Sequence, residues 1–258
     1  MALFQGSVRS LSMQMDTNVN VIAPVEEYIE RLAPLNKTVI LLHGLKQNAD
    51  AWVRMSRVET YAARAGFYVV MPEAQRSFYT DMAYGIPYYT WIQEELPELI
   101  GRMFHMPMDP EHLYIAGLSM GGYGAMRLAM SRPERYAGAM SYSGCCMILE
   151  EDITTNGRMA SEEFRGIVGA DLTVPPEMRL STLVNNPGVE RLKYYAACGT
   201  EDWLWSDNLI FKKLMLGHGL KLTFEQWPGV HNWDFWDEAC RRSFALMAGI
   251  DPAILKAD

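Results

Sequence analysis

The sequence predicts an α/β fold in which a largely parallel sheet is covered by helices on both faces. Short apolar runs alternate with longer segments of helical periodicity, and continuous apolar runs are typical of strands that are buried on both sides. The chain has 258 residues, of which 49% are hydrophobic, and it contains no repeat or Gly/Ser-rich linker. A chain of this size can bury a full core, so we expect a single domain over residues 1–258.

The expected strands follow one another along the chain. Residues 8–13 and 18–22 alternate apolar with polar side chains, which predicts two opening antiparallel strands. Continuous apolar runs predict buried strands at residues 38–42, 67–71, 112–116, 136–141, 192–197 and 220–224. Helical patterns lie near residues 50–65, 90–104, 120–131, 204–217 and 233–247.

Residues 145–190 interrupt this alternation. The segment contains Asn156-Gly157, Pro175-Pro176 and Asn185-Asn186-Pro187-Gly188, which predict turns and short helices between two sheet strands. Loops at the carboxyl ends of parallel strands commonly bind ligands, so we expect a lid-like insertion here. The alternative is a segment that packs on the surface without a role at the site.

Charge and cysteine usage restrict the partners and the compartment. The net charge is −8, which disfavours nucleic acid, and no apolar run is long enough to suggest a membrane span. The opening residues have neither the basic nor the apolar region of a secretory signal, so we do not expect one here, with a processed precursor as the alternative. The four cysteines include an adjacent pair and no Cys-x-x-Cys spacing, so we expect reduced thiols and a cytoplasmic location. The sequence leaves a homo-oligomer open.

A Gly-x-Ser-x-Gly sequence, Gly117-Leu-Ser119-Met-Gly121, joins the strand expected at 112–116 to the helix expected at 120–131. In this strand–turn–helix context the motif presents a nucleophilic serine. The turn strains the serine backbone and brings strand and helix close together, which requires small flanking residues. The Met120 N–H at the helix start then faces an incoming oxyanion.

Other ligands for this glycine cluster are disfavoured. Tyr123 occupies the position at which a phosphate-binding loop needs lysine, and the third glycine of a dinucleotide fingerprint is missing. A Gly-rich turn in which Ser119 has only a structural role remains the alternative to a nucleophilic serine. Residues 105–112 include metal-ligand types, but two prolines and no regular face argue against a metal site. We expect neither a cofactor nor a metal.

A serine nucleophile needs a base, and the base needs a carboxylate that orients it. Asp202 follows the strand expected at 192–197, and His231 follows the strand expected at 220–224. The order Ser, Asp, His is that of α/β-hydrolases. Ser119, Asp202 and His231 are therefore the predicted catalytic residues.

The competing residues fit these positions less well. His231 alone lies in a loop between a late strand and a helix, unlike His43, His105, His112 and His218. Glu201 is one residue nearer to its strand than Asp202, and Asp207 falls within the next helical pattern.

The turn after residues 38–42 is expected to supply the second oxyanion donor. Gly44 lets the chain turn tightly, which leaves the Leu45 N–H free to face the site beside that of Met120. Aromatic residues are dense between Phe78 and Trp91 and around the predicted acid and base. They predict an apolar pocket to which we assign Gly44, Tyr84 and Trp91, with ordinary core packing as the alternative.

The chain resembles the tributyrin-esterase group of the esterase D superfamily, which also includes S-formylglutathione hydrolases, feruloyl and acetyl-xylan esterases, and mycolyltransferases. The resemblance spans roughly residues 36–245. Its motifs are Leu41-Leu-His-Gly-Leu45, Tyr79-Thr-Asp81 with Tyr84-Gly and Tyr88-Tyr-Thr, Glu94-Glu-Leu-Pro97, Ile115-Ala-Gly-Leu-Ser-Met-Gly-Gly-Tyr-Gly124, Cys198-Gly-Thr-Glu-Asp202 and His231-Asn-Trp-Asp-Phe-Trp236. It implies an α/β-hydrolase for short-chain acyl esters, with the triad and oxyanion donors named above.

The working hypothesis is a serine carboxylesterase that hydrolyses small-molecule esters through an acyl-enzyme. Within enzymes, the alternatives are a feruloyl or acetyl-xylan esterase, an S-formylglutathione hydrolase and an acyltransferase. A binding module built on an inactive hydrolase is the alternative from another class, but such proteins usually lack a triad residue and all three are present.

Overall fold

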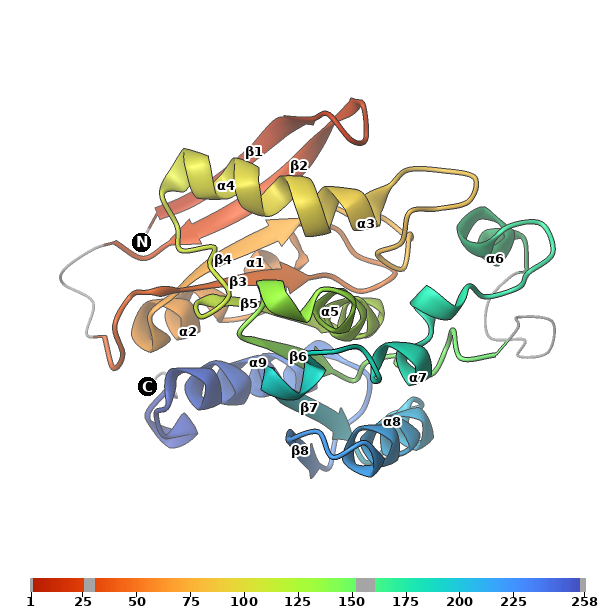
Figure 1. The fold of residues 1–258 in the computed structure, drawn as a ribbon. Coiled ribbons are helices and arrows are strands. Elements are labelled where there is room, and N and C mark those ends of the chain that lie inside the picture. Colours follow the sequence, from red (N-terminus) through yellow and green to blue (C-terminus); the bar gives the residue numbers. More distant parts are fainter. Residues whose placement is uncertain (1, 26–30, 152–160, 256–258) are drawn as a thin grey trace.

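The computed structural model describes residues 2–25, 31–151 and 161–255, which form one eight-stranded sheet in the order β1-β2-β4-β3-β5-β6-β7-β8 (Figure 1). β1 (Ala2–Ser10) and β2 (Met15–Ala23) form an antiparallel hairpin, and β2 pairs antiparallel with β4 (Phe67–Pro72). All later pairs are parallel. The predicted α/β class with a mostly parallel sheet is therefore confirmed.

The parallel strands follow the apolar runs closely. They are β3 (Lys37–Leu42), β4, β5 (Leu113–Leu118), β6 (Gly138–Tyr142), β7 (Lys193–Gly199) and β8 (Leu222–Trp227). β1 begins six residues before the expected residue 8, since the structure pairs Ala2 with Ala23. Much of this edge strand is solvent-exposed, so hairpin pairing rather than apolar alternation sets its length.

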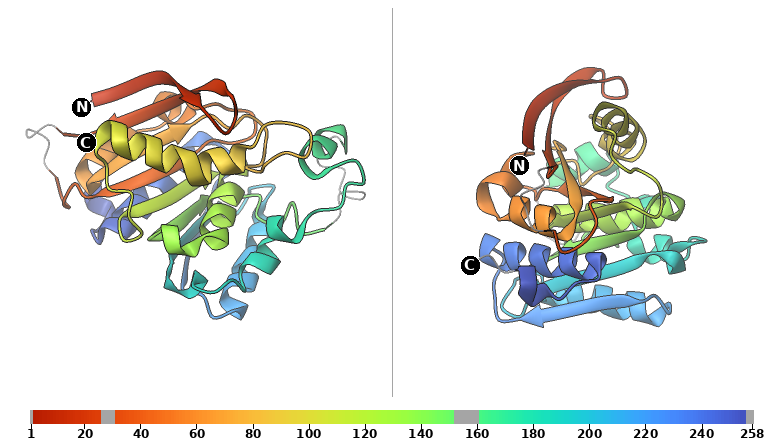
Figure 2. Two further views of the ribbon diagram at one scale, coloured as in Figure 1. Left: turned by 45° about the horizontal axis from the view of Figure 1, so that its top comes forward. Right: turned by 90° about the vertical axis from the view of Figure 1, so that its left-hand side faces the viewer.

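Helices cover both faces of the sheet, as the two layers in Figure 2 show. One face carries α1 (Ala51–Met55), α2 (Val58–Ala65) and α9 (Trp233–Ala248). The other carries α5 (Met120–Ser131), α8 (Trp205–Gly217), and α3 (Tyr88–Thr90), which continues through a π-helical turn (Trp91–Glu95) into α4 (Leu96–Phe104). A short 3-10 helix, Pro252–Leu255, follows α9.

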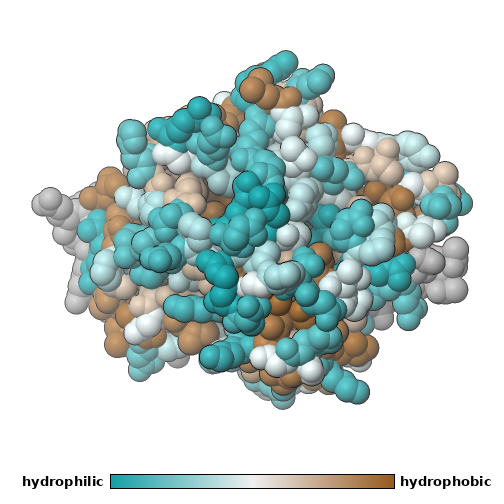
Figure 3. Space-filling view, in the orientation of Figure 1, coloured by the Kyte–Doolittle hydropathy of each residue, from teal (hydrophilic) through white to brown (hydrophobic). Residues whose placement is uncertain are grey.

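Alternate residues of β3 supply the two cores. Val39 and Leu41 pack with α1, α2 and α9, whereas Ile40 and Leu42 face the opposite helices. Successive strand side chains point to opposite faces, so a continuous apolar run fills both cores at once. Hydrophilic residues dominate the face in Figure 3, where apolar side chains form only small patches. No helix in the described ranges is long and apolar enough to cross a bilayer.

The segment at 145–190 connects β6 to β7 and contains short helices. They are α6 (Ser161–Val168), the 3-10 turns Pro176–Met178 and Val189–Arg191, and α7 (Leu180–Leu183). Residues 152–160 of the predicted insertion lie outside the described residues. The end of α6 accepts backbone hydrogen bonds of 3.0 Å from the N–H groups of Ala83 and Tyr84. Phe164 packs against Phe78 with ring centroids 5.7 Å apart.

A close approach of α5 to the sheet determines how the Ser119 turn is built. A Cβ on Gly121 would lie 2.6 Å from the carbonyl oxygen of Leu42 and 2.8 Å from that of His43. A Cβ on Gly117 would clash with the carbonyl oxygen of Gly121. Both contacts are with backbone, which cannot yield as a flexible side chain can, so only glycine fits.

We expect Gly121→Ala to lower the free energy of unfolding by about 1–3 kcal/mol, because the new methyl group would push α5 away from β3. Gly6→Ala on β1 is the matched control, since nothing lies within 4 Å of a Cβ there. The control should stay within about 0.5 kcal/mol of the wild type. Urea unfolding of the three proteins measures this, and equal stabilities would contradict the packing argument.

Candidate active site

Ser119 occupies the turn between β5 and α5, with φ 53° and ψ −115°. This conformation is unfavourable for a residue with a side chain and persists only where its surroundings enforce it. The Ser119 N–H donates to the Tyr142 carbonyl at 2.9 Å, and the Cys145 N–H donates to the Ser119 carbonyl at 3.1 Å. These bonds fix the turn at the carboxyl edge of the sheet, with the Ser119 side chain in the cavity described below.

His231 connects the serine to a carboxylate. It lies between β8 and α9, with Nε2 3.0 Å from Ser119 Oγ and Nδ1 2.9 Å from Asp202 Oδ2. An ionised carboxylate only accepts hydrogen bonds, so we assign the imidazole proton to Nδ1. Nε2 is then free to accept the Ser119 hydroxyl proton, which is the arrangement of a catalytic triad.

The Asp202 carboxylate is held ionised. Its side chain is fully buried, and the Leu204 N–H donates to Oδ1 at 2.8 Å. Burial by itself would raise the pKa of Asp202, but the hydrogen bonds from His231 and Leu204 outweigh it, so the pKa lies below its usual value. The competing Glu201 instead accepts hydrogen bonds from Thr200 and from the Gly229 N–H.

The structure brings both predicted oxyanion donors to the serine. Leu45 and Met120 line the same cavity as Ser119, and within the described residues neither N–H donates to another protein group. The Leu45 turn is held by the Gly44 N–H, which donates to Gln47 Oε1 at 2.9 Å, and by the Tyr79 hydroxyl, which donates to the His43 carbonyl at 2.7 Å. Two free N–H groups beside a hydroxyl suit a developing oxyanion.

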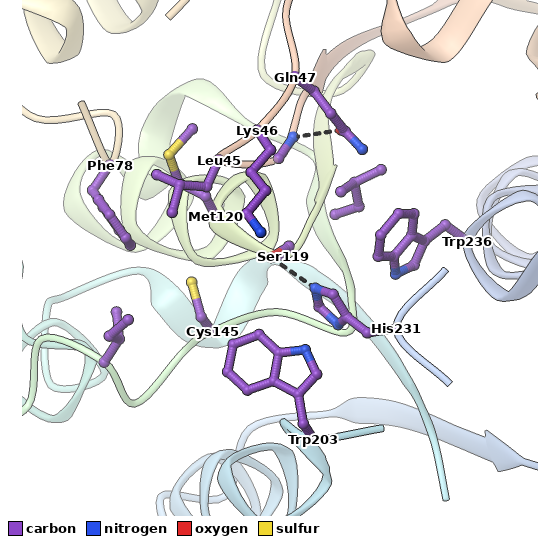
Figure 4. Close-up of a pocket in the computed structure, with 13 residues that line it drawn as sticks. Leu45, Lys46, Gln47, Phe78, Ser119, Met120, Cys145, Trp203, His231 and Trp236 are labelled. Atoms are coloured by element: carbon purple, nitrogen blue, oxygen red, sulfur yellow. Dashed lines mark hydrogen bonds between the residues drawn. The ribbon is translucent and has the colours of Figure 1, made fainter. Parts of the chain in front are cut away.

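The cavity over these groups has a volume of about 490 Å³, which is within the range of small-molecule sites. Trp203 and Trp236 flank the imidazole, with ring centroids 5.1 and 4.9 Å from that of His231. Figure 4 shows the lining side chains around Ser119. They are Gly44, Leu45, Lys46, Gln47, Phe78, Leu118, Ser119, Met120, Cys145, Ile148, Trp203, His231 and Trp236.

Two of the three residues assigned to the pocket lie elsewhere. Trp91, the first residue of the π-helical turn, is fully buried in the core and does not line the cavity. Tyr84 is 67% exposed, and its backbone binds the end of α6 rather than the cavity. Gly44 does line the cavity.

The main cavity walls were not assigned from sequence. Phe78 belongs to the same aromatic stretch as Trp91, but periodicity alone does not say which of the two faces the serine. Trp203 and Trp236 belong to the tryptophan-rich segment around the acid and base, which was the available signal. Cys145 and Ile148 carry no motif.

His43, one of the histidines that fitted the role of the base less well than His231, is buried. It is 1% exposed, and its Nε2 accepts a hydrogen bond of 3.1 Å from the Ala74 N–H. Among the described residues, no group of three or more histidine, cysteine or carboxylate side chains is placed to hold a metal ion.

A mostly parallel sheet with a serine on a strained strand-to-helix turn, and with Asp and His after later strands, defines an α/β-hydrolase. The chain belongs to the putative esterase family, whose model matches residues 10–245. Across 97% of this chain and 99% of the relative, it is 27% identical to an acetyl esterase from Caldicellulosiruptor saccharolyticus. It is 32% identical to an S-formylglutathione hydrolase of Mus musculus over a segment covering 40% of this chain and 31% of that protein.

Solved structures agree with this assignment. FphF, a fluorophosphonate-binding serine hydrolase of Staphylococcus aureus, superimposes with a TM-score of 0.84 at 28% identity and covers 96% of this chain and 98% of its own. A ferulic acid esterase has the same fold, with a TM-score of 0.80 at 21% identity and coverage of 97% and 98%. The family and its relatives make the chain a serine carboxylesterase.

Acid should destabilise the wild type more than Asp202→Asn. The pKa of Asp202 is lowered on folding, so its ionised form contributes stability above the unfolded pKa of about 3.9, and that contribution is lost as the pH falls through the folded value. Asparagine cannot titrate. We therefore expect a smaller loss of unfolding free energy between about pH 6 and about pH 3 in the variant.

Urea unfolding at several pH values measures this difference. Asp16→Asn is the control, because Asp16 is 67% exposed and forms only a surface ion pair with Arg9. Wild type and control should share one acid profile. Identical profiles for wild type and Asp202→Asn would contradict the predicted ionisation of this carboxylate.

Proposed function

We propose that Ser119, His231 and Asp202 catalyse the hydrolysis of short-chain acyl esters, with the Leu45 and Met120 N–H groups as the oxyanion hole. One observation carries this proposal: the unbroken hydrogen-bond chain from the Ser119 hydroxyl through both His231 nitrogens to the buried Asp202 carboxylate.

The reaction follows from these positions. Ser119 Oγ attacks the ester carbonyl carbon while His231 Nε2 takes the hydroxyl proton, and Asp202 stabilises the imidazolium. The Leu45 and Met120 N–H groups stabilise the negative oxygen of the tetrahedral intermediate. When the ester C–O bond breaks, His231 returns the proton to the leaving alcohol. Water then cleaves the acyl-enzyme by the same steps.

The cavity lining suits the acyl part of an ester. Phe78, Cys145 and Ile148 line it as an apolar wall, and its volume of about 490 Å³ is within the range of small-molecule sites. The name of the full-length relative, an acetyl esterase, agrees with a small acyl group. Hydrolysis of thioesters such as S-formylglutathione would use the same groups, which makes it the second candidate.

Residues 1–258 are proposed to act as one domain, with 145–190 as a partial lid. Cys145 and Ile148 from this segment line the cavity, and Phe164 packs against Phe78, which lines it as well. A cytoplasmic location is also a proposal, supported by cysteines that are buried as free thiols. Whether the chain forms a homo-oligomer stays a prediction.

A fluorophosphonate probe should label the wild type at Ser119 and fail to label Ser119→Ala. Turnover of p-nitrophenyl acetate by that variant should fall by on the order of 10⁶, because both the nucleophile and the acyl-enzyme are lost. Ser7→Ala on the exposed edge strand is the control and should keep full labelling and turnover. Labelling of Ser119→Ala at wild-type level would reject the assignment.

The substrate range is tested with purified enzyme on matched esters. We expect kcat/KM to be highest for p-nitrophenyl acetate and butyrate and to decrease for longer chains, because the relative that matches over the full length is an acetyl esterase. Methyl ferulate and S-formylglutathione test the alternatives. A preference for either of these over the short-chain esters would overturn the proposed acyl specificity.

A further inference from the structure

The cavity mouth carries a cation that the triad chemistry does not use. Lys46 follows the oxyanion donor Leu45 and lines the catalytic cavity. In Figure 4 its side chain runs from the loop toward Ser119, with the amine at the end nearer the serine. A positive charge placed there acts on any charged group that a bound ester carries close to its reacting carbonyl.

The rest of the cavity does not neutralise this charge. Apart from Lys46 and the imidazole of His231, the lining side chains are apolar or uncharged, and none is a carboxylate. Across the described residues, Lys46 forms no ion pair or hydrogen bond with another side chain. The Lys46 side chain is exposed, so its ammonium group can contact solvent or a ligand.

A second, open groove adjoins the same loop, and it is lined by charged side chains besides Lys46. It measures about 450 Å³ and shares Leu45, Lys46 and Gln47 with the cavity. Arg76 also lines the groove, but its guanidinium is paired with Glu163 on α6 and donates to the Leu45 carbonyl. Glu73 lines the groove as well, and its carboxylate accepts hydrogen bonds from the Ala49 and Gln75 N–H groups.

The positive charge of Lys46 contrasts with the negative net charge of the chain. A net charge of −8 repels anionic substrates at long range. Among the described residues that line the cavity, Lys46 carries the one permanent charge, and its sign is opposite to that of the whole chain. A neutral ester gains nothing from this charge, whereas an ester with a carboxylate or phosphate gains an ion pair.

We propose that Lys46 selects esters that carry an anionic group near the scissile bond, and that it does so by pairing with that group at the cavity mouth. This inference rests on the proposed esterase site and names its substrate class. Lys46 is a specificity residue in this scheme, since the oxyanion hole and triad complete the reaction without it. The charge of Lys46 can pair with an anionic group on the alcohol or on the acyl part of the ester, and the experiment below tests each.

The experiment compares pairs of esters in which one member carries a free carboxylate and the other carries the same group as its methyl ester. On the alcohol side the pair is 4-acetoxybenzoate and its methyl ester. On the acyl side it is 4-nitrophenyl hydrogen adipate and its methyl ester. The ratio of kcat/KM for the anionic ester to that for its neutral partner is measured in each protein, so differences in intrinsic ester reactivity cancel between proteins.

Lys46→Met should lower this ratio at least about threefold for one of the pairs, as expected for a partly exposed ion pair, and leave the neutral esters within about twofold of the wild type. Lys46→Arg should keep the wild-type ratio. Lys193→Met is the matched control, because Lys193 is exposed at the amino end of β7, whereas the site lies at the carboxyl ends of the strands. In the wild type the ratio should also shrink as NaCl rises from about 0.05 M to about 0.5 M.

Two results would overturn the inference. An unchanged ratio in Lys46→Met would show that the lysine does not pair with substrate. An equal loss on neutral and anionic esters would show that it acts on the reacting oxygen or on the fold instead. Failure of the esterase proposal is distinct, since Ser119→Ala would then retain turnover of the neutral esters.

Discussion

The candidate site depends on how closely α5 approaches β3 and β5. Gly117 and Gly121 leave no room for a side chain between strand and helix, and this approach forces Ser119 into its strained turn. The strain is maintained by backbone hydrogen bonds to Tyr142 and Cys145, which lie on β6 and just beyond it. The nucleophile is therefore positioned by the sheet itself, and the orientation of its hydroxyl is a consequence of backbone packing.

The remaining groups of the site come from loops that the parallel sheet brings together. Leu45 follows β3, Asp202 follows β7, and His231 follows β8, so the carboxyl ends of three strands deliver them to one edge. Trp203 and Trp236 both pack against the imidazole and restrict its movement. In such surroundings the hydrogen bonds from His231 and the backbone keep Asp202 ionised despite its burial.

Charge is distributed unevenly between the protein and its cavity. The chain is acidic overall, but Arg76 is paired with Glu163 while Lys46 projects into the mouth of the cavity. The Arg76–Glu163 pair also joins the loop after β4 to α6. Within the part of the chain that the structure describes, this region thus combines the Arg76–Glu163 ion pair with Lys46, which has no ion-pair partner and can meet a ligand.

The sequence by itself determined the fold class, the approximate positions of the parallel strands and the local context of Ser119, Asp202 and His231, because periodicity, turn residues and chain order are local properties. It did not determine that β4 lies between β2 and β3, or that Phe78 rather than Trp91 lines the cavity. Those outcomes depend on which helix face packs inward and on contacts between distant segments. Only the tertiary structure decides them, since one aromatic stretch can fill a core or line a pocket with equal local propensity.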